Sequence, residues 1–374
     1  MLPKSESFTH KIFMLWHEMM NDTQISENYN IRSRTMEKLK AIQVGTGGFG
    51  ASWLEILDKF QEIELVGVVD VNSANLENAK QFIHNNSVQY YTDHIEAFAK
   101  CKADIAVIVT PPQTHKKLAL DALAYDLYVF MEKPIAQKFE DAKELLEKSK
   151  TYEKFIMISQ NYRWRPEIQA VKKVLEEDVI GKVEYVEWNF RRATKFGGWR
   201  DQYSEILIED MSIHHFDLMR YLLGVNPSTV FAKSLKPSWS WFNGNSAASL
   251  TMSFEDVLIN YFGSWVTRGK ETPWNGDFKL VGEKGAIELN DNCPTVTFEN
   301  GEIKQLELVQ MQYEDREYSI YEMVSAIKQG RNPSTVLSDN IQSFALVGAS
   351  LQSIQLNKEI DVQDMLVKGS VISG

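Results

Sequence analysis

Residues 39–50, Leu39-Lys-Ala-Ile-Gln-Val44 followed by Gly45-Thr46-Gly47-Gly48-Phe49-Gly50, decide the fold of this chain. The first six residues are typical of a buried strand, and the glycines follow the Gly-x-Gly-x-x-Gly spacing of a turn that leads into a helix. Gly45 permits the tight turn, Gly47 leaves space for a pyrophosphate, and Gly50 lets the helix approach the sheet. We therefore predict that residues 45–50 bind a dinucleotide through the backbone N–H groups at the helix start. The alternative is a glycine-rich turn without a ligand.

Asp70 ends the next apolar run, 70 − 50 = 20 residues after the third glycine. An acid at this distance is expected to accept hydrogen bonds from the adenosine ribose hydroxyls. Its carboxylate would repel a 2′-phosphate, and no Arg or Lys follows until Lys80. NAD is therefore the predicted cofactor, and NADP is less favoured. The alternative is that Asp70 caps the following helix.

From residue 38 to about residue 160, short apolar runs alternate with amphipathic segments. Strands that alternate with helices predict crossover connections and a doubly wound parallel sheet, the Rossmann arrangement. The expected strands are Leu39–Val44, Leu65–Asp70, Asp104–Thr110, Leu127–Glu132 and Phe155–Gln160, and the expected helices include Asn75–His84, Thr114–Ala124 and Phe139–Ser149.

After residue 183 the pattern changes to strands with period-two alternation, which indicates a large, mostly antiparallel sheet with one open face. The predicted fold class is therefore α/β, with a Rossmann domain at 36–160 and an α+β substrate-binding and oligomerisation domain at 161–374. The last ten or so residues are expected to fray. The expected strands here are Val183–Phe190, Ser249–Phe254, Val257–Trp265, Phe278–Val281, Ala286–Leu289 and Thr295–Glu299, and helices are expected after Pro166, near Ser319–Lys328 and near Asp339–Leu356.

Residues 1–35 differ in character from the rest, and we interpret them as an extension outside the fold; a docking helix is the alternative. The chain has 374 residues and a net charge of 40 − 51 = −11, which argues against nucleic acid or an anionic membrane as a partner. No apolar stretch of about 18 residues occurs, so no membrane span is predicted. Two cysteines, Cys101 and Cys293, favour a reducing compartment, and we expect a cytoplasmic protein.

Two further loops are expected beside the cofactor, because ligands of an open parallel sheet bind outside the carboxyl ends of its strands. The fourth strand ends in Thr110-Pro111-Pro112, with His115 in the next helix, and the fifth ends in Glu132-Lys133-Pro134. We predict cofactor contacts from Thr110, Pro111, Pro112, His115, Glu132 and Lys133. An ordinary strand-end lysine is the alternative for Lys133.

A third cluster lies on a predicted helix that starts near Asp210 and stops at Gly224. Asp210 and His214 are four residues apart and so share a helix face, whereas His215 points away. A carboxylate one turn from an imidazole can raise its pKa and fix its tautomer, as a proton-transfer pair requires. The alternatives are a capping Asp with a structural His, or a metal site whose third ligand we cannot place; no metal is predicted.

Taken together, these motifs resemble the glucose–fructose oxidoreductase/inositol dehydrogenase/rhizopine catabolism (Gfo/Idh/MocA) family over about residues 36–356. The resemblance implies that Lys133 contacts the reacting hydroxyl and the nicotinamide, and that Asp210 and His214 form the proton-transfer pair. It also implies association through the open sheet face, as a homodimer or homotetramer. The segment Asn161–Pro166 is similar to the family's junction segment, from which Tyr162 departs, and Glu205–Glu209 lacks the family's glycines.

The stretch from Trp188 to Tyr203 is dense in aromatic residues and arginines. Aromatic faces stack on sugar rings and arginines bind hydroxyls or carboxylates, so we predict a polyhydroxylated small-molecule substrate. The alternatives are a solvated loop and nucleic-acid binding by Arg191 and Arg192. The predicted substrate-binding residues are Arg163, Trp199, Arg200, Tyr203 and His215.

The predicted activity is transfer of hydride between nicotinamide and a secondary hydroxyl of a sugar, inositol or related polyol. His214, oriented by Asp210, would take the hydroxyl proton, and Lys133 would stabilise the developing alkoxide. Two alternatives stay open. One is an epimerase or glycosidase that uses NAD for transient oxidation, and the other is a dinucleotide-sensing regulator without catalysis.

Overall fold

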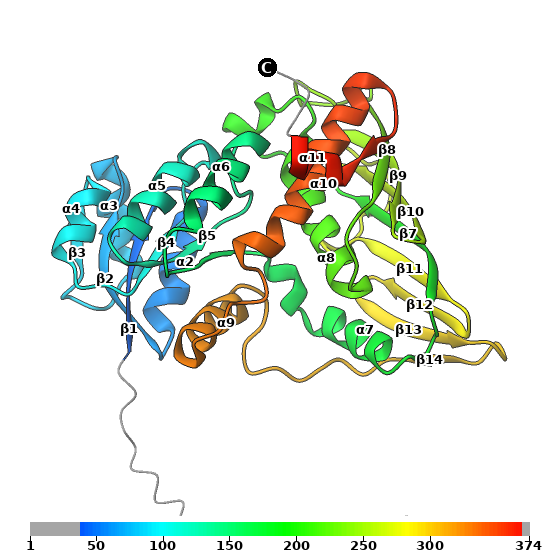
Figure 1. Cartoon of the computed structure of the whole chain (residues 1–374), viewed down its shortest axis with the longest axis horizontal. Coiled ribbons are helices and arrows are strands. Elements are labelled where there is room, and N and C mark those ends of the chain that lie inside the picture. The colour runs from blue at the N-terminus through cyan, green and yellow to red at the C-terminus, as the bar shows by residue number, and fades with distance from the viewer. Residues whose placement is uncertain (1–37, 369–374) are drawn as a thin grey trace, which may run out of the picture. The chain divides into compact units, whose positions relative to one another are not determined.

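The structure of the protein is a computed structural model that describes residues 38–368, apart from the side chains of Trp199 and Lys368. The extension predicted at residues 1–35 lies outside the described residues. Figure 1 shows the described chain as an N-terminal parallel sheet and a larger second sheet, each with its own helices.

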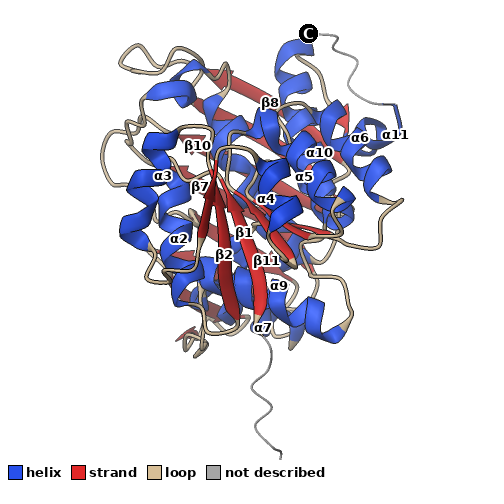
Figure 2. Cartoon of the chain, turned by 90° about the vertical axis from the view of Figure 1, so that its left-hand side faces the viewer, coloured by secondary structure: helices blue, strands red, loops and turns tan. Residues whose placement is uncertain are grey.

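The N-terminal sheet has six parallel strands in the order β3-β2-β1-β4-β5-β6. This order is the Rossmann order, so the predicted doubly wound sheet is confirmed. Both faces of the sheet are covered by helices, which explains why its strands are mostly apolar (Figure 2). The strands are β1 (Leu39–Val44), β2 (Ile63–Val69), β3 (Gln89–Tyr91), β4 (Ile105–Ile108), β5 (Tyr128–Met131) and β6 (Ile156–Ile158), and the helices between them are α2 (Phe49–Lys59), α3 (Ser73–Ala79), α4 (His94–Lys100), α5 (Pro112–Ala124) and α6 (Phe139–Ser149).

A helix from much later in the sequence, α9 (Asp315–Gln329), completes one face of this sheet. Its buried residues Ile320 and Met323 belong to the same apolar core as Trp53 of α2 and Val107 of β4. Helices α4, α5 and α6 pack on the opposite face. The sequence pattern predicts α9 as a helix, but not that it packs on the N-terminal sheet.

The second sheet has nine strands in the order β14-β13-β12-β11-β7-β10-β9-β8-β15. All neighbouring pairs are antiparallel except β7 and β10, so the predicted mostly antiparallel sheet is confirmed. The strands are β7 (Val183–Arg191), β8 (Thr229–Leu235), β9 (Ala247–Phe254), β10 (Val257–Ser264), β11 (Asp277–Gly282), β12 (Gly285–Asn290), β13 (Cys293–Phe298), β14 (Ile303–Gln305) and β15 (Ile360–Asp361).

Helices cover one face of this second sheet and leave the other face open. In β10, Val257, Ile259 and Tyr261 are buried, whereas Leu258 and Phe262 are exposed. This alternation is the one that the sequence predicts for a half-covered sheet. The covering helices are α7 (Pro166–Glu176), α8 (Ile213–Leu223), α10 (Leu337–Leu356) and α11 (Val362–Lys368).

The elements that the sequence pattern misses are mostly short. Strands β3 and β15 have three and two residues, and α4 has seven, too few to display a clear periodicity. The expectation of a frayed C-terminal tail, over about residues 365–374, is wrong for residues 365–368, which form the end of α11; residues 369–374 lie outside the described part of the chain. Val362 and Met365 of this helix are buried in the core, which holds the segment in place. No helix in residues 38–368 is both long and apolar enough to cross a bilayer.

Because α9 supplies core residues to the N-terminal sheet, we expect Met323→Ala to lower the free energy of unfolding by about 2–5 kcal/mol. The side chain is 1% exposed, so its truncation leaves a cavity against the sheet. Denaturant unfolding measures the loss. The exposed Glu317, on the same helix, provides the control Glu317→Ala, which should change stability by no more than about 0.5 kcal/mol. Equal effects of the two substitutions would contradict this assignment of α9.

Candidate active site

The glycine loop lies between β1 and α2 and is built for close backbone approach. Gly45 has φ +94°, and a Cβ there would lie 2.2 Å from the Val109 carbonyl oxygen. A Cβ on Gly50 would lie 2.4 Å from the Gly45 carbonyl oxygen. No side chain caps the first turn of α2, so backbone N–H groups of this turn are left for an anionic ligand, although that of Gly50 donates to the Gly47 carbonyl oxygen at 2.9 Å. The loop therefore fits the pyrophosphate of a dinucleotide.

Gln43, which our sequence reasoning missed, holds this loop in shape. Its buried Nε2 donates to the carbonyl oxygens of Gly45 at 2.8 Å and of Gly50 at 2.7 Å. The signal in the sequence is a polar residue in the buried second half of strand β1, between Ile42 and Val44, because such a residue needs a partner in the core.

Asp70 lies at the end of β2 beside the loop, as predicted. Its Oδ2 accepts from the backbone N–H and the hydroxyl of Thr46, at 2.9 and 3.1 Å. Its Oδ1 accepts from the backbone N–H of Asn72 and the amide of Asn75. The alternative role as a helix cap falls to Asn72, whose side chain accepts from Ala74 at the start of α3. Asp70 thus joins the glycine loop to the next helix, with a half-buried carboxylate.

His115 requires a correction, because its ring is fully buried and not available to a cofactor. Its Nδ1 and Nε2 each lie 2.8 Å from a backbone carbonyl oxygen, that of Pro134 and that of Thr110. His115 therefore connects the loops after β4 and β5. His115 lies on α5, which starts at Pro112 with Pro111 as its N-cap. Thr110 precedes this cap, so Thr110, Pro111 and Pro112 lie at the predicted edge of the sheet, where β4 leads into α5.

Glu132 and Lys133 point in different directions from the end of β5. Glu132 is 7% exposed and accepts from Trp53 Nε1 at 3.0 Å and from the Lys133 backbone N–H at 3.1 Å. Burial raises its pKa. Glu132 thus links the loop after β5 to Trp53 of α2. The predicted cofactor contact would need an exposed carboxylate, and that of Glu132 is buried. Lys133 Nζ instead donates to the Asp210 backbone carbonyl at 2.8 Å and lies 3.4 Å from its Oδ1.

The helix that carries Asp210 and His214 differs from the predicted α-helix in its first turn. Residues Leu207–Ser212 form a π-helical turn, and α8 continues from Ile213 to Leu223 before Gly224 ends it with φ 73°. Single π-helical turns are frequent at functional sites. The Asp210 carboxylate contacts Lys133 and Arg200 Nε, the latter at 3.3 Å. Asp210 and His214 were predicted to act as a proton-transfer pair, but no hydrogen bond joins them among the described residues.

His214 is packed by aromatic stacking. Its ring lies parallel to that of Tyr162, with 4.3 Å between centroids and 9° between planes, and the Arg165 guanidinium lies 3.5 Å from the same Tyr162 ring. His214 Nδ1 is buried and has no hydrogen-bond partner among the described residues. Burial, and then the positive charge of Lys133, hold the pKa of His214 well below its ordinary value of 6.5. The prediction of a raised pKa is therefore wrong, and the ring is neutral at pH 7.

Arg163 and His215 were predicted to bind substrate, but both are engaged in the core. Arg163 makes a two-pronged ion pair with Asp217, with distances of 2.6 and 2.7 Å, and also contacts Asp339. His215 lies 3.0 Å from the Tyr261 hydroxyl and 2.9 Å from the Trp274 carbonyl oxygen, and burial lowers its pKa to about 4. The sequence could not reveal these partners, because they come from distant segments.

The other predicted substrate residues lie near Asp210. Arg200 reaches its carboxylate, as described above, and the negative charge of Asp210 adds to burial in raising the pKa of Tyr203. The side chain of Trp199 is outside the described part of the structure. The structure therefore brings Lys133, Asp210, His214, Arg200 and Tyr203 together, whereas Arg163 and His215 are held by other partners.

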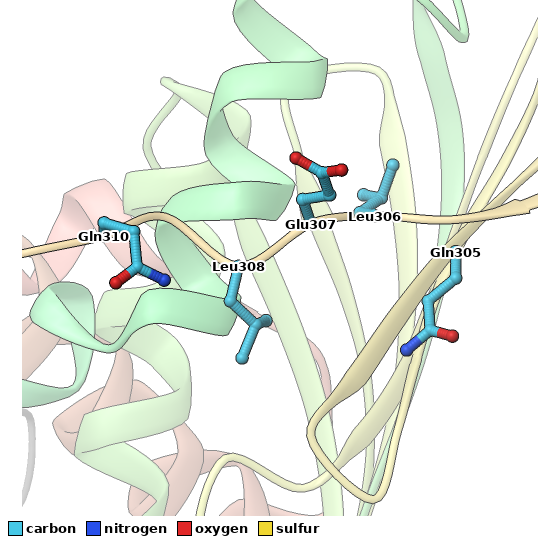
Figure 3. A pocket seen from close by; sticks show the side chains of 5 residues that line it. All are labelled: Gln305, Leu306, Glu307, Leu308 and Gln310. Atoms are coloured by element: carbon cyan, nitrogen blue, oxygen red, sulfur yellow. The ribbon is translucent and has the colours of Figure 1, made fainter.

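A pocket on the surface lies apart from these residues, along the segment that follows β14. Gln305 and Leu308 point to one side of this extended segment and Leu306 and Glu307 to the other (Figure 3). Its lining residues are Gln305, Leu306, Glu307, Leu308 and Gln310, which include none of the predicted site residues. Among residues 38–368, no group of three or more His, Cys, Asp or Glu side chains is placed to hold a metal ion.

A Rossmann sheet with a glycine loop, an acid after β2 and a lysine after β5 defines an NAD-binding oxidoreductase as the class of protein. Comparison with known families agrees: residues 39–160 match the "Oxidoreductase family, NAD-binding Rossmann fold" and residues 168–288 match the "GFO/IDH/MocA C-terminal domain". The chain belongs to the Gfo/Idh/MocA family. The predicted family and the predicted cofactor, NAD, are thereby confirmed.

Relatives and solved structures agree with this family. D-apiose dehydrogenase of Rhizobium rhizogenes is 26% identical over 88% of this chain and 99% of its own length. An Agrobacterium radiobacter oxidoreductase in complex with NAD⁺, L-tartaric acid and magnesium has a TM-score of 0.79 at 24% identity, covering 88% of this chain and 99% of its own. A levoglucosan dehydrogenase in complex with NADH has a TM-score of 0.76 at 18% identity, covering 87% and 99%. The two solved structures therefore share their fold with this chain along almost their whole length.

The ion pair between Arg163 and Asp217 leads to a stability prediction. Both side chains are buried, and Arg163→Ala would leave the Asp217 carboxylate without its main partner, so we expect a loss of about 3–5 kcal/mol in the free energy of unfolding. Denaturant unfolding measures it. If Arg163 bound substrate instead, the variant would keep its stability and show a raised KM, and that result would contradict the structural role.

Proposed function

We propose that this chain is an NAD-dependent dehydrogenase that oxidises a secondary hydroxyl of a sugar or related polyol. The observation that carries the proposal is the approach of Lys133, at the carboxyl end of a parallel strand, to Asp210, one turn from His214, whose pKa is lowered. The similarity to D-apiose dehydrogenase supports a sugar as the substrate class.

The cofactor-binding residues of the proposal follow from the geometry of the loops. The uncapped backbone N–H groups at the start of α2 would hold the pyrophosphate, with Gly47, Gly48 and Phe49 nearest to it. The Asp70 carboxylate would accept from the adenosine ribose, and Thr110 lies at the edge of the same sheet. Bound NAD supplies the hydride acceptor of the reaction.

His214 is the proposed general base. A neutral imidazole can accept the proton of a substrate hydroxyl on its unprotonated nitrogen, and the low pKa of His214 keeps the ring neutral. Stacking on Tyr162 holds the plane of the His214 ring. Tyr162 thus orients the ring, a role that the sequence assigns to Asp210. The base therefore depends on packing for its orientation.

Lys133 is the proposed electrostatic catalyst. Its ammonium donates to the Asp210 carbonyl, and this contact fixes the group close to His214, whose pKa it lowers. A fixed cation at this place stabilises the alkoxide character that develops as the hydroxyl loses its proton. The Asp210 carboxylate, 3.4 Å from the same ammonium, would bind the substrate hydroxyls together with Arg200.

We also infer that the chain forms a homo-oligomer through the open face of its second sheet. Tyr185 of β7 and its neighbour Leu258 of β10 are 42% and 47% exposed, and Phe262 of β10 is 40% exposed on the same face. Such an apolar group on a sheet face supports association with a second copy. The cytoplasmic location stays a prediction.

The activity is tested with a panel of sugars, inositols, sugar phosphates and uronic acids, following NADH formation. We expect turnover with at least one of them, and a loss of about 10²–10⁴-fold in kcat for Lys133→Ala and for His214→Ala, with NAD binding retained. Lys138, exposed five residues further along the chain, provides the control Lys138→Ala. Near wild-type turnover in either variant would exclude that residue from the chemistry. Product without net NADH would identify transient oxidation instead.

The pH dependence tests the role of Tyr162. The neutral form of His214 is present above its pKa, which lies well below 6.5, so kcat/KM should stay level as the pH falls through 6.5. Tyr162→Ala would expose the ring to water, and the pKa would rise toward 6.5, so activity would decline at a higher pH than in the wild type. Tyr162→Phe keeps the stacked ring and should keep the wild-type profile. Identical profiles for the Ala and Phe variants would contradict this role.

A further inference from the structure

One arginine outside every predicted motif lies against the glycine-loop helix. Arg316 is the second residue of α9, and its Nη1 donates to the hydroxyl of Ser52 in α2 at 2.7 Å. Its guanidinium lies 5.2 Å from the centre of the Phe49 ring and 5.4 Å from that of Trp53. Ser52 in turn donates to the Phe49 carbonyl oxygen, so a chain of hydrogen bonds leads from Arg316 to the end of the loop.

The electrostatic surroundings of Arg316 are unusual. Although acids outnumber bases 51 to 40 in this chain, Arg316 makes no ion pair with an Asp or Glu among residues 38–368. The first turn of α2 contains no acidic residue, and a helix N-terminus is itself positive. A half-buried cation at the positive end of a helix is unfavourable unless an anion joins it.

We propose that Arg316 is a cofactor-binding residue that pairs with the pyrophosphate of NAD. A guanidinium has five N–H donors in a fork that matches phosphate oxygens, and Ser52 accepts only one hydrogen bond from Arg316. Cation–π contacts with Phe49 and Trp53 limit the movement of the guanidinium without using its donors. The inference rests on the NAD assignment and is independent of the sugar substrate.

This assignment connects the cofactor to the proposed base through neighbouring residues. Asp315, next to Arg316, accepts from Arg165 Nε at 2.8 Å, and Arg165 lies on the Tyr162 ring that stacks on His214. Arg316 therefore belongs to the same short segment of α9 that anchors the packing around His214. Binding of the pyrophosphate would hold this end of α9 against α2.

The test is a binding titration of the full chain, without turnover. NADH binding is measured by fluorescence, and ADP and adenosine are measured as competitors, because only ADP carries the diphosphate. We expect Arg316→Ala to weaken NADH and ADP by about tenfold or more and adenosine by less than about twofold. Arg316→Lys keeps the charge but not the forked set of donors, so its affinities for NADH and ADP should fall between those of Arg316→Ala and the wild type.

Arg331 provides the matched control. It lies just past the other end of α9 and is paired with Glu322 at 2.8 Å, so Arg331→Ala should leave all three affinities within about twofold of the wild type. An NADH affinity of Arg316→Ala within about twofold of the wild type would overturn the proposal. So would an equal loss for adenosine and ADP, because it would indicate a distorted loop. Failure of the unmodified chain to bind NADH would overturn the cofactor assignment itself, and this proposal with it.

Discussion

The hydrogen bond from the Lys133 ammonium to the Asp210 carbonyl is the contact on which the site depends. It joins the end of β5 in the N-terminal sheet to the π-helical turn that precedes α8, two segments that are far apart in the sequence. Because the acceptor is a backbone carbonyl, the contact depends on the path of the main chain and survives changes in the Asp210 side chain. The acceptor lies in the π-helical turn Leu207–Ser212, a geometry that is frequent at functional sites.

The chemistry of His214 follows from what surrounds it. Removal of water and the nearby positive charge of Lys133 both disfavour the imidazolium, so the ring is kept as a base. A carboxylate hydrogen-bonded to the ring would have the opposite effect. The carboxylate of Asp210 is instead engaged by Lys133 and Arg200, which leaves aromatic packing to orient the histidine.

The sequence predicts the local parts of this structure well and the long-range partnerships poorly. The glycine loop and the position of Asp70 depend on short-range spacing, and both sheets follow from the alternation of apolar residues. The structure also brings Lys133 and Asp210 together, as the motifs suggest. By contrast, the partners of Arg163 and His215 come from α8, α10 and the second sheet, and nothing near either residue in the sequence reveals them. The π-helical turn likewise has no signature that a periodicity of 3.6 would detect.

The position of α9 makes the dinucleotide-binding half inseparable from the rest of the chain. A fragment of residues 39–160 would uncover the apolar face that Ile320, Met323 and Val324 shield, and its last strand would lose the hydrogen bond from Ile158 to Thr335. Such a fragment could not act as an independently folding unit that is fused to other catalytic domains. Evolution of a new specificity in this architecture would therefore have to proceed by altering residues in place, because exchange of whole halves would break a shared core.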